Sequence, residues 1–534
     1  MALLHVSPLQ AGGMTQRLRL LYPFLFAVLP ILNILTRSPG ESSMADVAVV
    51  VGVMLAGCAL AYGVIALATR GRGSSLVAPL VVFAVLLWFY GYDAAASWAR
   101  RLAGGSLGPV VVTLAVLATV AAVWWLARRP RYLDRITTFL ALTGVLLVGW
   151  STAQVIRDQL RARRTLHESV VAKELAKPVA VKGTAQGQEP RRDIYLIVLD
   201  EYANSGVLEE QLGFDNRVFE DSLRHLGFTI PRLVRSNYVH TSLSLPSLLN
   251  FSHLTGLTSE LGSQATDPTL PNHLLEANRT AAFLKAKGYR LLFFPSQWWL
   301  STHHNRYADW EFQAWSGLEP GREATRSDLR RSFLRGTVLD LLRRDHAHDA
   351  DHVRRTLAAL ARVPDDPRPT FAFAHILNPH RPYAFDADCR ILKARATSDR
   401  ASGRRDGYVG QAQCLNTLLL SLVTSLIQRS SPEPIILLQG DHGTNMLDYS
   451  SARSAGAVSP DQARERFGAF GAYYVPGGGS RLFTDSVTVV NVMTKVLNYY
   501  FNAGIPPAPD SLYMSLERSP YRFVPVDPAS LIRP

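Results

Sequence analysis

Five long apolar runs lie in the first third of this 534-residue chain, and they constrain its fold more than any other feature. Each approaches the roughly 20 residues that an α-helix needs to cross a bilayer. They are about Leu20–Thr36, Val47–Thr69, Leu76–Tyr92, Gly108–Ala127 and Ile136–Ile156. A cleaved signal peptide accounts for at most the first run. Buried helices of a water-soluble protein rarely come as five such runs joined by short arginine-bearing loops. The sequence therefore predicts a membrane domain of about five helices over residues 1–156.

The arginines between these runs predict the orientation of the chain. With the N-terminus inside, eight arginines lie on the inner side and three on the outer side. The inner ones are Arg17, Arg19, Arg70, Arg72, Arg128, Arg129, Arg131 and Arg135; the outer ones are Arg37, Arg100 and Arg101. Four arginines after the last run oppose this weakly, but they precede a long domain, where the rule loses force. We expect a bacterial-type inner or plasma membrane protein whose C-terminal domain faces the periplasm or the outside.

Residues 157–192 connect the two predicted domains. Arg157–Ala176 has the pattern of an amphipathic helix at the membrane surface, and a solvated connecting helix fits it equally well. The following stretch, KPVAVKGTAQGQEPRR, is rich in Pro, Gly, Gln and charge, which indicates a linker. The outer domain is then expected over residues 193–534.

The outer domain alternates strand-like and helix-like segments. The strands are DIYLIVLD, YRLLFFP, RPTFAFAHI, EPIILLQG and GAFGAYYVP. Helical patterns lie between them, among them Asn216–Leu226, Thr280–Lys287 and Thr417–Gln428. This alternation predicts an α/β domain with a mainly parallel sheet covered by helices on both faces. In such sheets ligands bind at the carboxyl ends of the strands.

Three of these strands end on residues that can bind a metal ion. The residues are Asp200 with Glu201, His375 with His380, and Asp441 with His442. Carboxylate and imidazole ligands suit Zn²⁺ and Mn²⁺, with Mg²⁺ and Ca²⁺ as further candidates. A single acid at a strand end often only caps the next helix. Three such ends at one edge of a sheet indicate a divalent metal site.

A hydroxyl-rich turn, SNYVHTSLSLPSLLNF, offers a nucleophile. Thr241 lies just before a helix that we expect Pro246 to help start. Free backbone N–H groups at a helix start favour phosphate or sulfate. Ser242 and Ser244 are alternative nucleophiles, and each of the three hydroxyls could instead be a simple helix cap.

Three cysteines are present. Cys58 falls in a predicted span, whereas Cys389 and Cys414 fall in the outer domain, where oxidation is permitted. A disulfide between these two and a pair of free thiols both remain open.

The combination of LIVLDEY, HTSLSLPS, NPHRPY and QGDHGTN after five spans resembles the membrane-bound, sulfatase-like branch of the alkaline phosphatase superfamily. That branch includes lipoteichoic-acid synthases and lipid A phosphoethanolamine transferases. The resemblance implies an alkaline-phosphatase-like outer domain and a metal bound by Asp200, Thr241, Asp441 and His442, with Glu201 as the alternative to Asp200. It also implies that Thr241 is the nucleophile, that His380 contacts the substrate or leaving group, and that Arg306 in HHNRY contacts the phosphate.

The resemblance implies a metal-dependent transferase that moves phosphoethanolamine or phosphoglycerol from a membrane phospholipid to an envelope glycan or lipid. A hydrolase of phosphate or sulfate esters is the alternative, and a non-catalytic envelope protein is the second alternative. A sulfatase that uses formylglycine needs Cys or Ser in C/S-x-P-x-R. Here SLPSL, Ser244–Leu248, has Leu248 in place of the arginine. We expect no nucleic-acid partner.

Overall fold

The computed structural model describes residues 8–37, 44–70, 75–179, 191–296, 302, 304–312, 333, 337–339, 347–392, 401–483 and 485–531. Its contacts divide the chain into two compact units. The helical unit contains Met1–Arg164 and Thr325–Arg343, and the α/β unit contains Thr165–Ala324 and Arg344–Pro534. The helical unit thus includes a segment that lies, in the sequence, inside the α/β unit.

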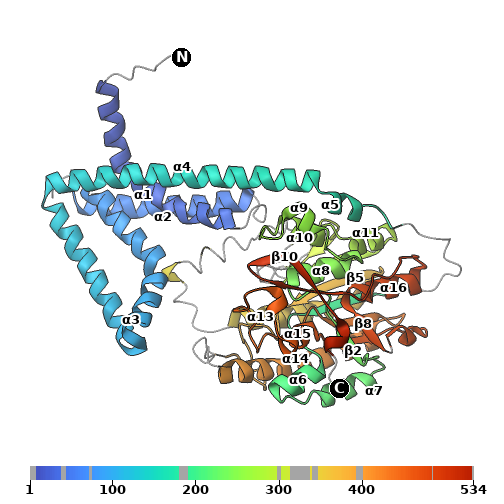
Figure 1. Cartoon of the computed structure of the whole chain (residues 1–534). Helices are drawn as coiled ribbons and strands as arrows, with labels where there is room; N and C mark the ends of the chain where they lie inside the picture. Colours follow the sequence, from blue (N-terminus) through green and yellow to red (C-terminus); the bar gives the residue numbers. More distant parts are fainter. Residues whose placement is uncertain are drawn as a thin grey trace. The chain divides into compact units, whose positions relative to one another are not determined.

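The helical unit consists mainly of four long helices. They are α1 (Pro8–Arg37), α2 (Met44–Ala68), α3 (Val77–Ala127) and α4 (Pro130–Glu168). Five stretches before residue 170 are long and apolar enough to cross a membrane, because α3 carries two of them, Val77–Ala103 and Leu107–Ala127. Figure 1 shows these as two arms of α3 that meet at a bend. The prediction of about five spans is confirmed.

Large apolar side chains cover the outside of this unit. Leu60 is 71% exposed and Leu146 is 72% exposed. Such exposure is unfavourable in water and normal for a surface that faces lipid. Phe333, from the separate Thr325–Arg343 segment, is instead buried against Ile31, Leu35 and Val50. Ile31, Leu35 and Val50 lie at the ends of α1 and α2 that the arginine count places on the outer side of the membrane.

Helix α4 continues past the last predicted span, and a short helix, α5 (Val170–Leu175), follows it. Ser169 caps α5 by accepting a hydrogen bond from the N–H of Ala172. The Ser169 hydroxyl and the Val171 N–H both donate to Glu260. Ala172 is buried among apolar residues of the α/β unit. The end of the Arg157–Ala176 segment therefore packs against protein.

The α/β unit is built on a six-stranded sheet with the order β4-β3-β5-β1-β6-β7. The strands are β1 (Ile194–Leu199), β3 (Arg290–Phe294), β4 (Trp310–Glu311), β5 (Thr370–Ile376), β6 (Ile435–Gly440) and β7 (Gly471–Tyr474). All neighbours are parallel except β6 and β7. The predicted, mainly parallel sheet is confirmed, and all five strands named from the sequence are part of it.

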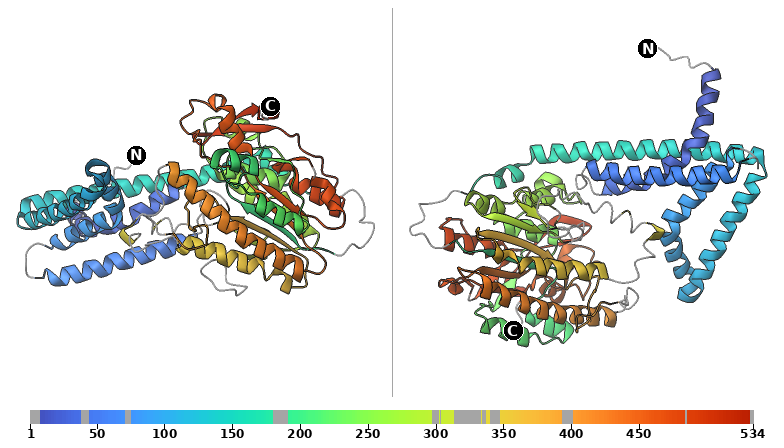
Figure 2. Two further views of the ribbon diagram at one scale, coloured as in Figure 1. Left: turned by 90° about the horizontal axis from the view of Figure 1, so that it is seen from below. Right: turned by 180° about the vertical axis from the view of Figure 1, so that it is seen from behind.

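Helices cover both faces of the sheet. The side chains of β1 alternate, so Tyr195 and Ile197 enter one core and Leu196 and Val198 enter the other. Figure 1 shows α8 (Thr241–Asn250), α11 (Arg279–Ala286) and α16 (Val492–Phe501) on one side of the sheet, with α6 (Ser205–Leu212), α7 (Arg217–His225) and α14 (Ala401–Arg429) on the other. Figure 2 shows the same layers from two further directions. Strands buried on both faces explain the unbroken apolar runs of β1 and β6.

The remaining elements surround this core. They are α9 (Leu257–Leu261), α10 (Thr269–Glu276), α13 (Ala347–Leu360), α15 (Pro460–Phe467) and two small sheets, β2 (Leu233–Arg235) with β8 (Ser486–Thr488) and β9 (Leu512–Leu516) with β10 (Ser519–Val526). Part of α14, Gly403–Arg429, is also long and apolar enough to cross a membrane. Its Leu415 and Leu419, however, are buried in the core of the α/β unit. Cys389 and Cys414 form a disulfide with Cα atoms 5.0 Å apart, which settles the alternative left open by the sequence.

Candidate active site

The strand register brings three side chains that could bind a metal ion to the carboxyl edge of the sheet. β1 lies between β5 and β6, and Leu199 is paired with Gly440. Asp200 and Asp441 follow directly after these two residues, and His375 lies on β5 opposite Val198. One ligand atom from each of Asp200, His375 and Asp441 lies within 4.8 Å of the others. We call these three residues the ligand cluster.

The ligand cluster fits a divalent metal ion. All three side chains are buried. Both carboxylate oxygens of Asp200, Oδ2 of Asp441 and Nε2 of His375 have no hydrogen-bond partner among the described residues. Buried polar atoms without partners are rare and unfavourable, unless an ion or water completes them. Burial, and then the adjacent Asp200 carboxylate, raise the pKa of Asp441 well above its ordinary value, as expected for two neighbouring buried carboxylates.

The second oxygen of Asp441 is held by the backbone. Its Oδ1 accepts hydrogen bonds from the N–H of Glu201 at 3.0 Å and of His442 at 2.8 Å. These bonds fix the carboxylate plane, so that Oδ2 is the oxygen that points into the cluster.

His442 connects this cluster to the threonine. Its Nδ1 lies 3.1 Å from the carbonyl oxygen of Gly443, which can only accept, so Nδ1 carries the proton. The unprotonated Nε2 then faces the Thr241 hydroxyl oxygen at 3.1 Å and Asp441 Oδ2 at 3.2 Å. Burial, and then the guanidinium of Arg466, lower the pKa of His442 well below its ordinary value. The imidazole is therefore neutral, with a lone pair directed at Thr241.

Thr241 is the first residue of α8. The helix starts here and not near Pro246, because the carbonyl of His240 accepts from the N–H groups of both Leu243 and Ser244. The expectation that Pro246 helps to start this helix was therefore wrong. The first N–H groups of a helix have no acceptor within it, so the Thr241 hydroxyl lies beside free donors at the positive helix end.

The two neighbouring serines differ from Thr241. The hydroxyl of Ser244 is buried and donates to the carbonyl oxygen of Asp441 at 2.6 Å. Ser242 is half-buried. Of the three hydroxyls in the turn, Thr241 is the one that contacts His442.

Glu201 pairs with Arg466 and is not part of the ligand cluster. Its backbone has a left-handed φ of 58°, and its carboxylate accepts from Arg466 at 2.8 Å. The adjacent Asp200 is thus the acid that joins the cluster.

Two glycines allow the close approach of the chain around Asp441 and His442. A Cβ atom on Gly440 would lie 2.2 Å from the carbonyl oxygen of Tyr202. One on Gly443 would lie 1.9 Å from the carbonyl oxygen of Glu465. Backbone oxygens cannot move aside as a flexible side chain can, so both positions require glycine.

With this geometry established, the chain can be compared with known proteins. The Sulfatase family profile matches residues 210–479, about half of the chain. This chain belongs to the sulfatase family. The family places it among enzymes of phosphate or sulfate ester chemistry. The matched range contains Thr241, His375, Asp441 and His442. No curated protein sequence matches the chain.

Several solved structures are similar to this sulfatase-family chain. One is the periplasmic domain of EcEptC from Escherichia coli in complex with Zn, with 13% identity, a TM-score of 0.41, and coverage of 60% of this chain and 85% of that one. Another is the integral membrane protein lipooligosaccharide phosphoethanolamine transferase A from Neisseria meningitidis, with 14% identity, a TM-score of 0.38, and coverage of 90% and 93%. A third is the periplasmic domain of the phosphoethanolamine transferase EptC from Campylobacter jejuni, with 12% identity, a TM-score of 0.36, and coverage of 58% and 89%.

His380 lies next to the site of this sulfatase-family enzyme. Its backbone N–H donates to the carbonyl oxygen of Asp200 at 3.2 Å. Arg306 is exposed. Its backbone N–H donates to the carbonyl oxygen of Glu276. Burial, and then the positive charge of Arg306, lower the pKa of His273. No contact that we describe joins the Arg306 side chain to the ligand cluster, so its role as a phosphate contact stays a prediction.

Two residues of this site are absent from the ligand set and the catalytic roles that the family resemblance implies. His375 lies at the end of an apolar strand. The same sequence signal, an apolar strand that ends on a possible ligand, indicates Asp441. Arg466 lies in PDQARERF, which has the composition of an ordinary surface helix. Its side chain is nevertheless 5% exposed and contacts Glu201. No local sequence signal marks it, because its partners are distant in the chain.

Proposed function

We propose that this protein is a metal-dependent transferase that uses Thr241 as its nucleophile. It takes phosphoethanolamine or phosphoglycerol from a membrane phospholipid and passes it to an envelope glycan or lipid, on the outer side of the membrane. One observation carries the proposal: the Thr241 hydroxyl lies at a helix start and faces the Nε2 lone pair of His442, beside a buried ligand cluster. The helical unit supports it, because donor and product would both lie in the bilayer.

The residues that would hold the metal are Asp200, His375 and Asp441, with His442 and Thr241 at the Asp441 side of the cluster. When bound, a divalent cation lowers the pKa of a coordinated hydroxyl and neutralises charge on phosphoryl oxygens. The backbone around the cluster orients Asp441 through the N–H groups of Glu201 and His442. It also keeps His442 in the tautomer that faces Thr241.

The transfer has two half-reactions. In the first, Thr241 Oγ1 attacks the phosphorus, a Thr241–phosphorus bond forms, and the bond from phosphorus to the diacylglycerol oxygen breaks. The Thr241 hydroxyl loses its proton, and the diacylglycerol oxygen takes up a proton. In the second, an acceptor hydroxyl loses its proton and its oxygen forms a bond to the phosphorus. The Thr241–phosphorus bond breaks, and the Thr241 oxygen takes up a proton. We propose His380 and Arg306 as the groups that contact the departing or arriving oxygens.

The deciding experiment is intact-protein mass spectrometry of the detergent-purified full chain after incubation with phosphatidylethanolamine or phosphatidylglycerol. We expect an added mass equal to the phospho-headgroup, located on Thr241, together with released diacylglycerol. The Thr241→Ala variant should form no adduct and have no turnover, while it keeps its fold and metal content. The Ser242→Ala variant is the matched control and should retain the adduct. An adduct in Thr241→Ala would move the nucleophile to a neighbouring serine.

The family match also favours a second candidate, a hydrolase of phosphate or sulfate esters. This enzyme would use the same residues with water as the acceptor. Rapid turnover of soluble aryl phosphates or aryl sulfates, without diacylglycerol release from phospholipid, would support it. Formylglycine at Ser244 is disfavoured by the burial of that hydroxyl and its bond to Asp441. A protein that formed no adduct and hydrolysed no ester would be the non-catalytic alternative.

A further inference from the structure

The last turn of α15 contacts the chain segments that carry the residues of the candidate site. Four consecutive residues, Arg464 to Phe467, each contact a different part of the α/β unit. Glu465 and Arg466 are both charged and both buried, at 1% and 4% exposure. Charged residues are rarely this buried unless their partners are fixed. Packing alone therefore does not explain why two charged side chains are buried in this turn.

Arg466 joins the segments that carry the proposed catalytic groups. Its Nη1 donates to Glu201 Oε1 at 2.8 Å and to the carbonyl oxygen of Gly443 at 2.9 Å. Its Nη2 donates to the carbonyl oxygen of Val239 and lies 3.5 Å from His442 Nε2. One guanidinium thus connects the turn after β1, the turn before Thr241 and the loop after β6. Only arginine offers several donors in a rigid planar fork.

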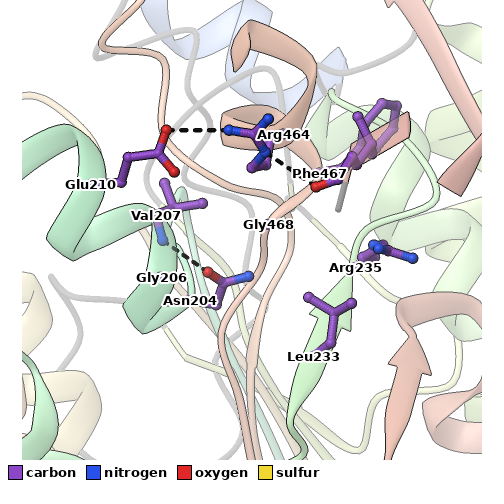
Figure 3. A pocket seen from close by; sticks show the side chains of 10 residues that line it. Asn204, Gly206, Val207, Glu210, Leu233, Arg235, Arg464, Phe467 and Gly468 are labelled. Atoms are coloured by element: carbon purple, nitrogen blue, oxygen red, sulfur yellow. Dashed lines mark hydrogen bonds and ion pairs between the residues drawn. The ribbon is translucent and has the colours of Figure 1, made fainter. Parts of the chain in front are cut away.

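Helix α15 is itself held firmly, so Arg466 projects from a fixed base. Ser459 and Gln462 form a capping box at its start. Arg464 donates to Glu210 of α6, as Figure 3 shows, and to the carbonyl oxygen of Leu531 near the C-terminus. Glu465 accepts from the Thr444 hydroxyl and from backbone N–H groups of the loop after His442. Contacts other than those of Arg466 therefore hold α15 in place on both of its sides.

The charge of Arg466 complements the site. Its guanidinium pairs with the Glu201 carboxylate, lies 3.5 Å from His442 Nε2 and stands over the ring of Tyr449, whose centre is 5.7 Å from the guanidinium carbon. Moving Arg466 would release the Val239 carbonyl, two residues before Thr241, and the Gly443 carbonyl, one residue after His442. Each release would let the 3.1 Å contact between Thr241 and His442 widen.

We propose that Arg466 is a positioning residue of the transfer reaction. It sets Thr241 against His442 and Asp441, and it acts through Glu201 and the two loop carbonyls without touching the substrate. This inference rests on the proposed function, and it adds to it a residue outside the motifs that carry the family resemblance.

The test compares Arg466→Lys, Glu201→Gln and the double variant with Arg290→Lys. Arg290 is the matched control, because it makes a half-buried ion pair with Asp366 at 2.6 Å at the opposite edge of the sheet. The measurements are the rate of Thr241 adduct formation, the dependence of that rate on lipid concentration, Zn²⁺ affinity by chelator competition, and the thermal midpoint. We use the full chain in detergent throughout.

We expect Arg466→Lys to slow adduct formation by on the order of tenfold to a hundredfold, since a misplacement of about 1 Å costs that much. The lipid concentration at half-maximal rate should stay unchanged, because Arg466 does not touch the lipid. Zn²⁺ affinity should fall severalfold, because the Asp441–Gly443 loop loses its anchor. Arg290→Lys should change neither rate nor affinity by more than about twofold. The double variant should be no slower than Arg466→Lys alone, because both changes break the same contact.

Wild-type rates in Arg466→Lys, or additive effects in the double variant, would overturn the proposal. A loss of rate that only follows the loss of folded protein would do so as well. If Arg466→Lys fails to fold, the Glu201→Gln variant alone tests the proposal. This change keeps the shape of the Glu201 side chain and removes its negative charge. If the wild-type chain forms no Thr241 adduct, the proposed function fails, and the Zn²⁺ affinities still decide whether Arg466 positions the ligand residues.

Discussion

At the residue scale, the site depends on which lone pairs the backbone leaves free. Backbone N–H groups occupy one oxygen of Asp441, and the Gly443 carbonyl occupies Nδ1 of His442. The atoms left over, Asp441 Oδ2 and His442 Nε2, face each other and Thr241. From the sequence, the strand ends predict three pairs of candidate ligands, which are Asp200 with Glu201, His375 with His380, and Asp441 with His442, and the family resemblance selects among them. The choice of Asp200 over Glu201 required the structure, because it depends on the distant Arg466.

Removal of a ligand should empty the metal site. We expect Asp441→Ala and His442→Ala each to lower the metal content of the purified chain, measured by elemental analysis, and His375→Ala to do the same. Asp388→Ala is the control, because this exposed acid pairs with Arg390 and is not part of the ligand cluster. Unchanged stoichiometry in Asp441→Ala would refute the cluster. An unchanged value in His442→Ala alone would leave His442 as a hydrogen-bond partner of Thr241 only.

Metal binding should depend on pH with a definite sign. Without metal, the raised pKa of Asp441 lets the folded chain keep a proton that the unfolded chain has lost. Stability of the metal-free protein therefore falls as pH rises from the ordinary Asp pKa, about 3.9, toward the raised one. A bound cation needs the carboxylate form, so Zn²⁺ should stabilise more strongly as pH rises, with proton release.

This dependence can be measured as thermal midpoints across pH in EDTA and in excess Zn²⁺. The gap between the two series should widen toward neutral pH and vanish in Asp441→Ala. Burial raises the pKa of Asp193 to about 6. That residue contributes a slope of the same sign in both series, so it cancels in the difference. A gap that narrowed with rising pH would contradict the assignment.

At the element scale, parallel strands and their connections determine where the ligands meet. The five strands were predictable because each is a continuous apolar run bounded by turn residues. The start of α8 was not, because the His240 carbonyl defines it and Pro246 sits further inside. The contribution of α15 was also hidden, since its sequence is polar and its buried arginine resembles a surface residue. Tertiary contacts decide such positions, and local pattern does not reveal them.

The contact between the β6 loop and α15 should be intolerant of a single methyl group. We expect Gly443→Ala to destabilise the α/β unit by about 3 kcal/mol, because the new Cβ would lie 1.9 Å from the Glu465 carbonyl oxygen. Gly456→Ala is the matched control, as no atom lies within 4 Å of its added Cβ. Thermal unfolding followed by circular dichroism measures both. Equal midpoints for the two variants would show that the loop has room to move.

At the scale of the whole molecule, the disulfide is consistent with the orientation that the arginine count predicts. Cys389 and Cys414 are paired, whereas Cys58 lies in an apolar helix of the helical unit. Disulfides persist outside the reducing cytoplasm. The α/β unit is therefore expected on the outer face of the membrane, as the eight inner arginines also indicate.

Thiol labelling of the protein in intact cells tests this. After quenching and denaturation, we expect a mass tag on Cys58 alone, and tags on all three cysteines only after reduction. Cys389→Ser should leave Cys414 reactive and should lower stability by about 3 kcal/mol, for a loop that spans 25 residues. Three reactive thiols without reduction would place the domain in the cytoplasm.

The burial of Phe333 in the helical unit bears on how a water-soluble enzyme could be prepared from this chain. Cutting the chain before Thr165 would remove Ile31, Leu35 and Val50, the partners of Phe333, while the segment that carries Phe333 stayed attached. An apolar side chain stripped of its partners favours aggregation. A truncated enzyme should therefore be more soluble if a short Gly/Ser bridge replaces residues 325–343 than if only the N-terminal spans are deleted.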